Sequence, residues 1–288
     1  MTTLLVLDFD GTMTDAEREG APFRGAYLDD IATLAGLPRD EVDVLAARFE
    51  AEVAANAHEE GWLFGGRIVA PATVDPYLRI MPVARRILDH AGAFTVPAER
   101  DRLLDGVLYK HNYGRTAIAF RDGAGRVLRS LAGTHTYVVT NSHTDAVQHK
   151  IKVLGGEAGD LDWLVARVHG RARKYILDDS WSAVGPSMQL PGLKRPVLLR
   201  RRLYHDALEG LRQRCGVGWE DVVVVGDIFE LDLALPLAMG ARVGLLVNDF
   251  TPVWEMDFLA DHPRGALLHA VSDVPGFAGL SVGVDVAG

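Results

Sequence analysis

Two carboxylates close to the start of the chain have the type and spacing for metal-assisted chemistry. Asp8 and Asp10 stand two residues apart, and Gly11, which lets the backbone turn sharply, follows them. Such a pair can hold a divalent cation and offer an oxygen nucleophile at the same time. The same tetrapeptide can also be a simple polar turn after a strand. Other parts of the chain have to distinguish these two interpretations.

Two further apolar runs end in hydroxyl or carboxylate groups, as the run at 4–7 does before Asp8. A run at 136–139 leads into Thr140 and Ser142, and a run of four valines leads into Asp227 and Asp232. The carboxyl ends of parallel strands meet at one edge of a sheet, so we expect these groups to converge there. Three such strand ends, two of them acidic, favour a functional site over three separate solvated turns.

The elements that would carry these groups alternate between strand and helix. The apolar run at 4–7 fits a strand buried on both faces of a parallel sheet. We predict an α/β fold with a doubly wound parallel sheet and an inserted helical domain. Predicted strands lie at 136–139, 164–168, 175–177, 221–226 and 242–247, predicted helices at 125–131, 146–154, 203–215 and 233–239, and a loop at 178–196.

The inserted segment, from about 23 to 113, is predicted to be helical and mostly amphipathic. Val42, Leu45, Phe49 and Val53 recur at helical spacing with charged residues between them. Two further helical patterns follow, one around 83–91 and one at 97–112. The insertion therefore forms a separate module directly after the first strand.

Composition limits the classes of function. The chain has 288 residues, of which 48% are hydrophobic and 24% charged, as in ordinary globular proteins. A net charge of −9 argues against a general nucleic-acid binder and means that an anionic substrate needs a local cation. One cysteine excludes an internal disulfide framework, and no run is long and apolar enough for a membrane span or a signal peptide. We expect a cytoplasmic protein with no membrane or nucleic-acid partner.

At these motifs the chain resembles the haloacid dehalogenase-like (HAD) hydrolase superfamily, the phosphatases that form an aspartyl phosphate. Residues 8–14 are similar to its first motif, 137–142 to its second and 223–232 to its fourth. The resemblance covers about 1–15 and 117–250. It implies a Rossmann-like catalytic core at 1–15 and 117–288 and a helical cap of the C1 type at 16–116.

The resemblance also implies roles for individual residues. Asp8 would attack the phosphoryl group, and Asp10 would protonate the leaving alcohol and then activate water. Thr140, Asn141 and Lys194 would bind the phosphoryl oxygens. The true dehalogenases of the family resemble this motif without the second carboxylate, so Asp10 favours phosphoryl chemistry.

A magnesium ion is the implied cofactor. Its ligands would be Asp8, the backbone carbonyl of Asp10 and Asp227, with Asp232 supporting directly or through water. A carboxylate that attacks an anion needs this positive charge, since like charges otherwise repel.

The identity of the phosphate-binding lysine is open. Lys194 precedes a predicted helix and is followed closely by a proline, which resembles the family's third motif. Lys174, which stands before the predicted strand at 175–177, is the alternative. Lys150 and Lys152 come too early in the motif order. The segment between Thr140 and Lys194 is longer than is typical of the family. We favour Lys194.

The resemblance implies a small phosphorylated metabolite as substrate, with specificity in the cap. Candidates for contacts to an anionic substrate are Arg24, His58, Arg67 and Arg79, although exposed arginines are usually solvated. The run 200–202, three arginines, is interpreted as a solvated helix face. A phosphotransferase or mutase using the same intermediate is an alternative function. A non-catalytic binding module on this fold is less favoured, because the motif carboxylates are intact.

Overall fold

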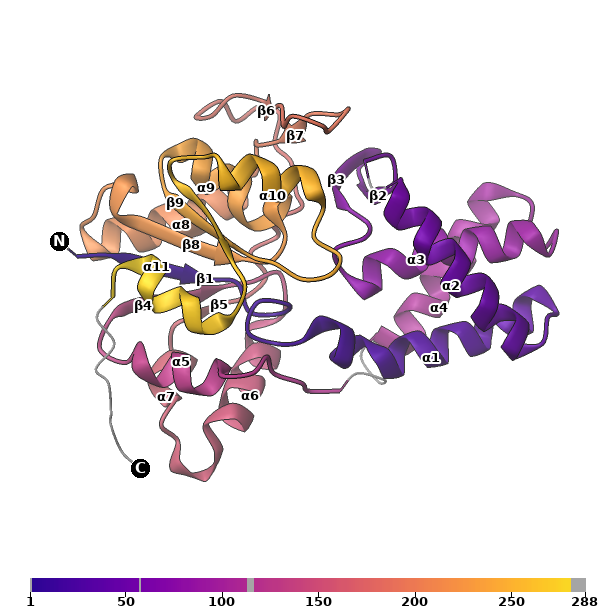
Figure 1. The fold of residues 1–288 in the computed structure, drawn as a ribbon, viewed down its shortest axis with the longest axis horizontal. Helices are drawn as coiled ribbons and strands as arrows, with labels where there is room; N and C mark the ends of the chain where they lie inside the picture. The colour runs from indigo at the N-terminus through magenta and orange to yellow at the C-terminus, as the bar shows by residue number, and fades with distance from the viewer. Residues whose placement is uncertain (1, 57, 113–116, 281–288) are drawn as a thin grey trace. The chain divides into compact units, whose positions relative to one another are not determined.

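The apolar run near the start of the chain forms the strand β1 (Leu4–Leu7) inside a parallel sheet (Figure 1). The computed structural model describes residues 2–56, 58–112 and 117–280. In it, β1 pairs in parallel with β4 (His135–Val139) on one side and β8 (Val222–Gly226) on the other. The six-stranded order is β10-β9-β8-β1-β4-β5, with β5 at Val168–His169, β9 at Arg242–Leu246 and β10 at Gly265–Leu268. The predicted α/β class and parallel sheet are confirmed.

Strand β1 is buried on both faces, which explains its unbroken apolar sequence. Leu4 and Val6 belong to one apolar cluster, whereas Leu5 and Leu7 belong to another. Successive side chains of a strand point to opposite faces, so each face of β1 contributes to its own core. A polar residue in this run would be buried whichever face it occupied.

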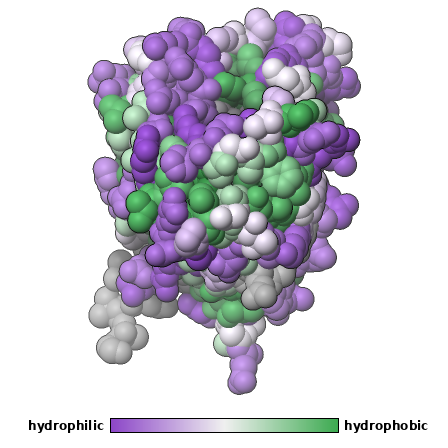
Figure 2. All heavy atoms as spheres, turned by 90° about the vertical axis from the view of Figure 1, so that its right-hand side faces the viewer, coloured by the Kyte–Doolittle hydropathy of each residue, from purple (hydrophilic) through white to green (hydrophobic). Residues whose placement is uncertain are grey.

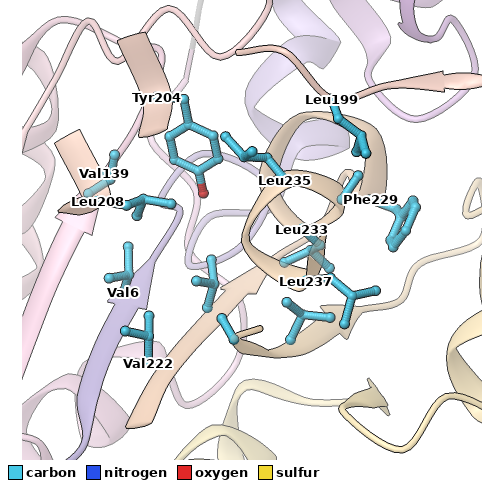
Figure 3. Packing of buried hydrophobic residues seen from close by; sticks show 14 of the residues in the cluster. Val6, Val139, Leu199, Tyr204, Leu208, Val222, Phe229, Leu233, Leu235 and Leu237 are labelled. Carbon is cyan, nitrogen blue, oxygen red and sulfur yellow. The ribbon is translucent and has the colours of Figure 1, made fainter. Parts of the chain in front are cut away.

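Helices cover each of the two faces of the sheet (Figure 1). Figure 3 shows the first cluster, in which Tyr204 and Leu208 of one helix and Leu235 of another pack with Val6 and Val222. The helices that contribute to this cluster are α8 (Arg202–Cys215), α9 (Ala234–Met239) and α10 (Val253–Ala260). The other cluster includes residues of α5 (Ala124–Ser130), α6 (Thr144–Gly155), α7 (Asp162–Val165) and α11 (Val274–Ala278).

The segment between β5 and α8 differs from its prediction. Of the strand expected at 164–168, residues 164–165 belong to the short helix α7, 166–167 form a turn, and 168 begins β5, which has two residues. Residues 175–177 form no strand. The expected loop at 178–196 contains β6 (Ser187–Met188), which pairs antiparallel with β7 (Val197–Leu198).

The chain divides into two compact units. One comprises 1–14, 64–70 and 120–288, and the other comprises 15–63 and 71–119. The core expected at 1–15 and 117–288 and the cap expected at 16–116 stay predictions, and position 116 lies outside the described residues. Residues 64–70, from within the insertion, group with the sheet.

The second unit is helical, as predicted for an insertion after β1. It contains α1 (Ala16–Ala35), α2 (Arg39–Ala55), α3 (Pro76–His90) and α4 (Pro97–Asn112). Between α2 and α3 the chain forms β2 (Gly61–Phe64) and β3 (Arg67–Pro71), of which residues 64–70 group with the first unit. Asp15 caps α1 by accepting the amide of Arg18, and Asp75 caps α3 in the same way. Burial raises the pKa of Asp75 to about 6.

Figure 2 shows a hydrophobic area surrounded by hydrophilic residues on one face of the molecule.

None of the helices in the described residues is both long enough and apolar enough to cross a membrane.

Candidate active site at the carboxyl edge of the sheet

Asp8 is held at the end of β1 by the neighbouring strand and by a tight turn. Its amide donates to the carbonyl of Val225, 2.8 Å away, which continues the β1–β8 pairing by one residue. The chain then turns at Gly11, which has a φ of +83°, where an L side chain is strained. A Cβ at Gly11 would also lie 2.2 Å from a carboxylate oxygen of Asp227. Only glycine lets the turn approach that carboxylate.

Three carboxylates meet beside this turn. Asp8, Asp227 and Asp232 are all buried, and one oxygen of each lies within 4.8 Å of the others. The hydroxyl of Thr12 donates to Asp227 at 2.9 Å, and the amide of Ile228 donates to Asp232 at 3.1 Å. The strand ends of β1 and β8 therefore converge as the sequence predicted.

Among the residues that the structure describes, the ammonium group of Lys174 contacts this acidic cluster. Lys174 is 1% exposed, and its Nζ lies 2.6 Å from Asp8 and 2.8 Å from Asp232. The same atom lies 5.2 Å from the ring centre of Tyr204. Burial alone would lower the pKa of Lys174, but the two carboxylates outweigh it and raise the pKa above its usual range. The lysine is therefore charged.

One ammonium does not balance three buried carboxylates. Burial raises the pKa of Asp8 to about 7, against the opposing effect of Lys174. Burial, followed by the charges of Asp232 and Asp8, raises the pKa of Asp227 well above its usual value. A buried set of oxygen donors with excess negative charge fits a hard divalent cation such as Mg²⁺, which would supply the missing charge.

The loop that carries Lys174 is pinned to the end of β4. The amides of Arg171 and Ala172 donate to the carbonyls of Ser142 and Thr140, at 2.7 and 2.9 Å. The amide of Lys174 itself donates to the side-chain oxygen of Asn141 at 2.7 Å. Asn141, expected to bind substrate, thus holds the lysine loop in place.

The buried Arg201 also holds the loop that carries Lys174, through hydrogen bonds to backbone carbonyls. Arg201 is 0% exposed, and its guanidinium donates to the backbone carbonyls of Lys174, Leu198 and Val69. Burial lowers the pKa of Arg201 to about 10, so it still carries a charge at neutral pH. Interpreting the run 200–202 as a solvated face is therefore wrong for its central residue. In the sequence, only the position of Arg201 directly before α8 could have indicated that it is buried.

The structure does not bring Lys194 to the acidic cluster. Lys194 is exposed and lies between β6 and β7, in the excursion that separates Lys174 from α8. Its neighbour Arg195 instead pairs with the buried Glu230. The position before α8 favoured Lys194 in the sequence, but the lysine that contacts Asp8 and Asp232 is Lys174. A lysine directly after β5, the strand beside β4, was the better signal.

Asp10 is half-buried, and its side chain has a cationic partner. Its carboxylate lies 2.7 Å from Nζ of Lys150 on α6. In the sequence, the early position of Lys150 in the motif order argued against it as the phosphate-binding lysine. The carboxylates that the described residues bring together for a metal are Asp8, Asp227 and Asp232, without the side chain of Asp10.

Thr140 is buried at the end of β4, and its hydroxyl accepts the amide of Ser142 at 3.2 Å. Because Leu7 and Val138 are in register, Thr140 leaves β4 at the same edge of the sheet at which Asp8 leaves β1.

Each of the four candidate contacts for an anionic substrate lies beside a carboxylate in the structure. Arg24 pairs with Glu50, and Arg67 with Asp179. Arg79 is 3% exposed and pairs with Glu17, so it is not a solvated surface residue. His58 lies 4.0 Å from a carboxylate oxygen of Glu59.

Known proteins match this chain by structure. No family model matches the sequence, and no curated protein is similar to it in sequence. A haloacid dehalogenase-like protein of unknown function from Agrobacterium tumefaciens superposes with a TM-score of 0.52 at 16% identity, covering 97% of this chain and 98% of its own. The HAD-hydrolase YfnB from Bacillus subtilis, bound to magnesium, superposes with a TM-score of 0.51 at 14% identity, covering 97% and 99%. The chain has the haloacid dehalogenase-like fold, as its motifs predicted.

Proposed function

We propose that the protein is a Mg²⁺-dependent phosphomonoester hydrolase that acts on a small phosphorylated metabolite through an aspartyl phosphate. The observation that carries the proposal is the buried carboxylate of Asp8, with a charged lysine on one side and two further carboxylates on the other. A lone buried nucleophile of this kind would repel a phosphate dianion. Here the lysine and a bound cation offset that repulsion.

Magnesium fits the site through Asp8, Asp227 and Asp232, and when bound it supplies positive charge that screens the phosphoryl oxygens. The magnesium in the Bacillus subtilis hydrolase supports the same choice of cation for this fold. The backbone carbonyl of Asp10 stays part of the proposed ligand set.

In the first half of the reaction, a carboxylate oxygen of Asp8 forms a bond to phosphorus while the bond from phosphorus to the substrate oxygen breaks. Asp10 gives a proton to the departing alcohol. We assign to Lys174 the phosphate-binding role that the sequence analysis gave to Lys194, because Lys174 already contacts Asp8. Thr140 offers a hydroxyl to the phosphoryl oxygens.

In the second half, water attacks the phosphorus of the aspartyl phosphate, and Asp10 accepts a proton from that water. The bond between phosphorus and the Asp8 oxygen breaks, which releases inorganic phosphate and restores the carboxylate. Asn141 keeps Lys174 in position in both halves by holding its backbone amide.

The test is phosphate release from a panel of phosphorylated metabolites with Mg²⁺, with EDTA as control. Asp8→Asn removes the nucleophile with little change of volume, and we expect it to abolish turnover. No release from any substrate by the wild type, or equal release by Asp8→Asn, would refute the proposal. Adding sugar and alcohol acceptors to the same assay distinguishes hydrolysis from phosphotransfer, since transfer yields a new phosphate ester.

A further inference from the structure

The loop that carries Lys174 also borders a cavity of about 450 Å³. The cavity lies within the first unit, between the end of β5, the start of α6 and the first turns of α8. None of the three clustered carboxylates lines it. Its lining includes Thr144, His169, Arg171, Arg173, Leu203 and Ala207.

The charge of this lining is unusual for a chain with an excess of acidic residues. It contains two arginines and no carboxylate, although the chain as a whole carries a net charge of −9. The guanidinium of Arg171 contacts Nδ1 of His143 at 3.1 Å. Among the residues that the structure describes, no carboxylate pairs with Arg171 or Arg173. Two positive charges therefore face this space without a protein counter-charge.

The backbone keeps both arginines at the cavity. Arg171 and Arg173 have φ values of 55° and 49°, the left-handed region that arginine seldom adopts. The hydrogen bonds of the loop to Thr140 and Ser142 hold this conformation. Ala172, the residue between the arginines, is buried, whereas Arg171 and Arg173 are exposed.

The rest of the lining is apolar. Val168 and Ala172 are buried beneath the arginines, and Leu203 on α8 is 43% exposed although it is a large hydrophobic residue. Burial lowers the pKa of His169, which is neutral at pH 7 and adds a ring without a charge. A cavity of this volume accommodates a small organic molecule. Guanidinium groups bind phosphate oxygens with matched geometry, and the apolar side accepts an uncharged body.

We propose that this cavity is a second anion-binding site, which holds a small organic phosphate by its phosphate group at Arg171 and Arg173 and by its apolar body against Leu203. The site does not depend on catalysis at Asp8. Because Arg173 directly precedes Lys174, a bound anion would also restrain the loop that carries the buried lysine.

The probe for this site is 4-bromophenylphosphonate, which carries a ring and a phosphonate that hydrolysis cannot remove. Titration calorimetry is done with EDTA, so that the three carboxylates of the acidic cluster repel the probe. The test variant is R171N/R173N, because asparagine tolerates the left-handed backbone. The matched control is R126Q/R264Q, which removes two exposed arginines elsewhere in the same unit.

The wild type should bind the probe, and R171N/R173N should bind it about tenfold or more weakly, because both charge-assisted contacts are lost. The control should stay within about threefold of the wild type, since distant exposed charges are screened by salt. The bromine should be found beside Leu203 by anomalous diffraction of soaked crystals. Unchanged affinity in R171N/R173N, no binding by the wild type, or bromine only at the acidic cluster would overturn the proposal. Should the double variant not fold, the single variant R173N gives the same comparison.

Discussion

Replacing Lys174 by methionine tests the central electrostatic argument most directly. Methionine keeps much of the volume of the lysine side chain but removes the ammonium that lies 2.6 Å from Asp8 and 2.8 Å from Asp232. Breaking a buried, hydrogen-bonded ion pair by removing one partner costs about 3–5 kcal/mol. Protonation of Asp8 would offset part of this loss, because the carboxylate would then no longer carry an unpaired charge. We therefore expect the greatest destabilisation above pH 7.

The effect on catalysis should be larger than the effect on folding. Loss of one preorganised group that stabilises transition-state charge lowers kcat by about 10²–10³-fold. We expect at least this loss in Lys174→Met, measured as phosphate release at saturating Mg²⁺. Urea unfolding in the same buffer establishes that the variant is folded at the assay temperature.

Lys194→Met is the matched control, because it makes the same chemical change at an exposed lysine. Its kcat should stay within about threefold of the wild type, since exposed charges contribute little and are screened. The reasoning is refuted if Lys194→Met loses as much activity as Lys174→Met, or if folded Lys174→Met turns over at the wild-type rate.

Three other predictions follow from the geometry of the site. Without metal, the pKa of Asp8 is raised from 3.8 to about 7, and the pKa of Asp227 is raised well above its usual value. The folded state therefore binds more protons than the unfolded state. Stability should therefore fall as pH rises from about 4 to about 7, and Mg²⁺ should reverse much of this loss in thermal unfolding; a metal-free chain that is most stable at pH 7 would contradict this. Gly11→Ala should lower the free energy of unfolding by about 1–3 kcal/mol and weaken Mg²⁺ binding, measured by urea unfolding and calorimetry, because of its positive φ and its contact with Asp227. Lys150→Met should lower turnover of alkyl phosphates by more than that of p-nitrophenyl phosphate, whose leaving group needs no proton, because the ion pair positions Asp10; equal losses on both substrates would refute this.

The acidic cluster could be predicted because each of its members follows an apolar run with a defined strand pattern. The apolar runs 4–7 and 222–225 fit central strands, and the carboxyl ends of such strands meet at one edge of a parallel sheet. Asp8 and Asp227 were therefore placed at one edge by local sequence alone. The helical insertion could also be predicted from the sequence, since its apolar residues recur at helical spacing.

The buried arginine at position 201 could not be predicted, because its partners are backbone carbonyls spread over three segments. A run of three arginines is usually solvated, and no local pattern marks which of them turns inward. Its burial depends on the path of the chain from β3, the lysine loop and β7 together.

What the sequence by itself determined is the strand-end chemistry: two carboxylates after β1, a threonine after β4 and two more carboxylates after β8. Only the tertiary structure determines which lysine side chains pair with these carboxylates. Lys174 reaches Asp8 across 166 positions in the chain, and Lys150 reaches Asp10 across 140. The physical reason is that strand patterns are local, whereas the position of a lysine side chain depends on strand order and on the path of the loops that follow the strands.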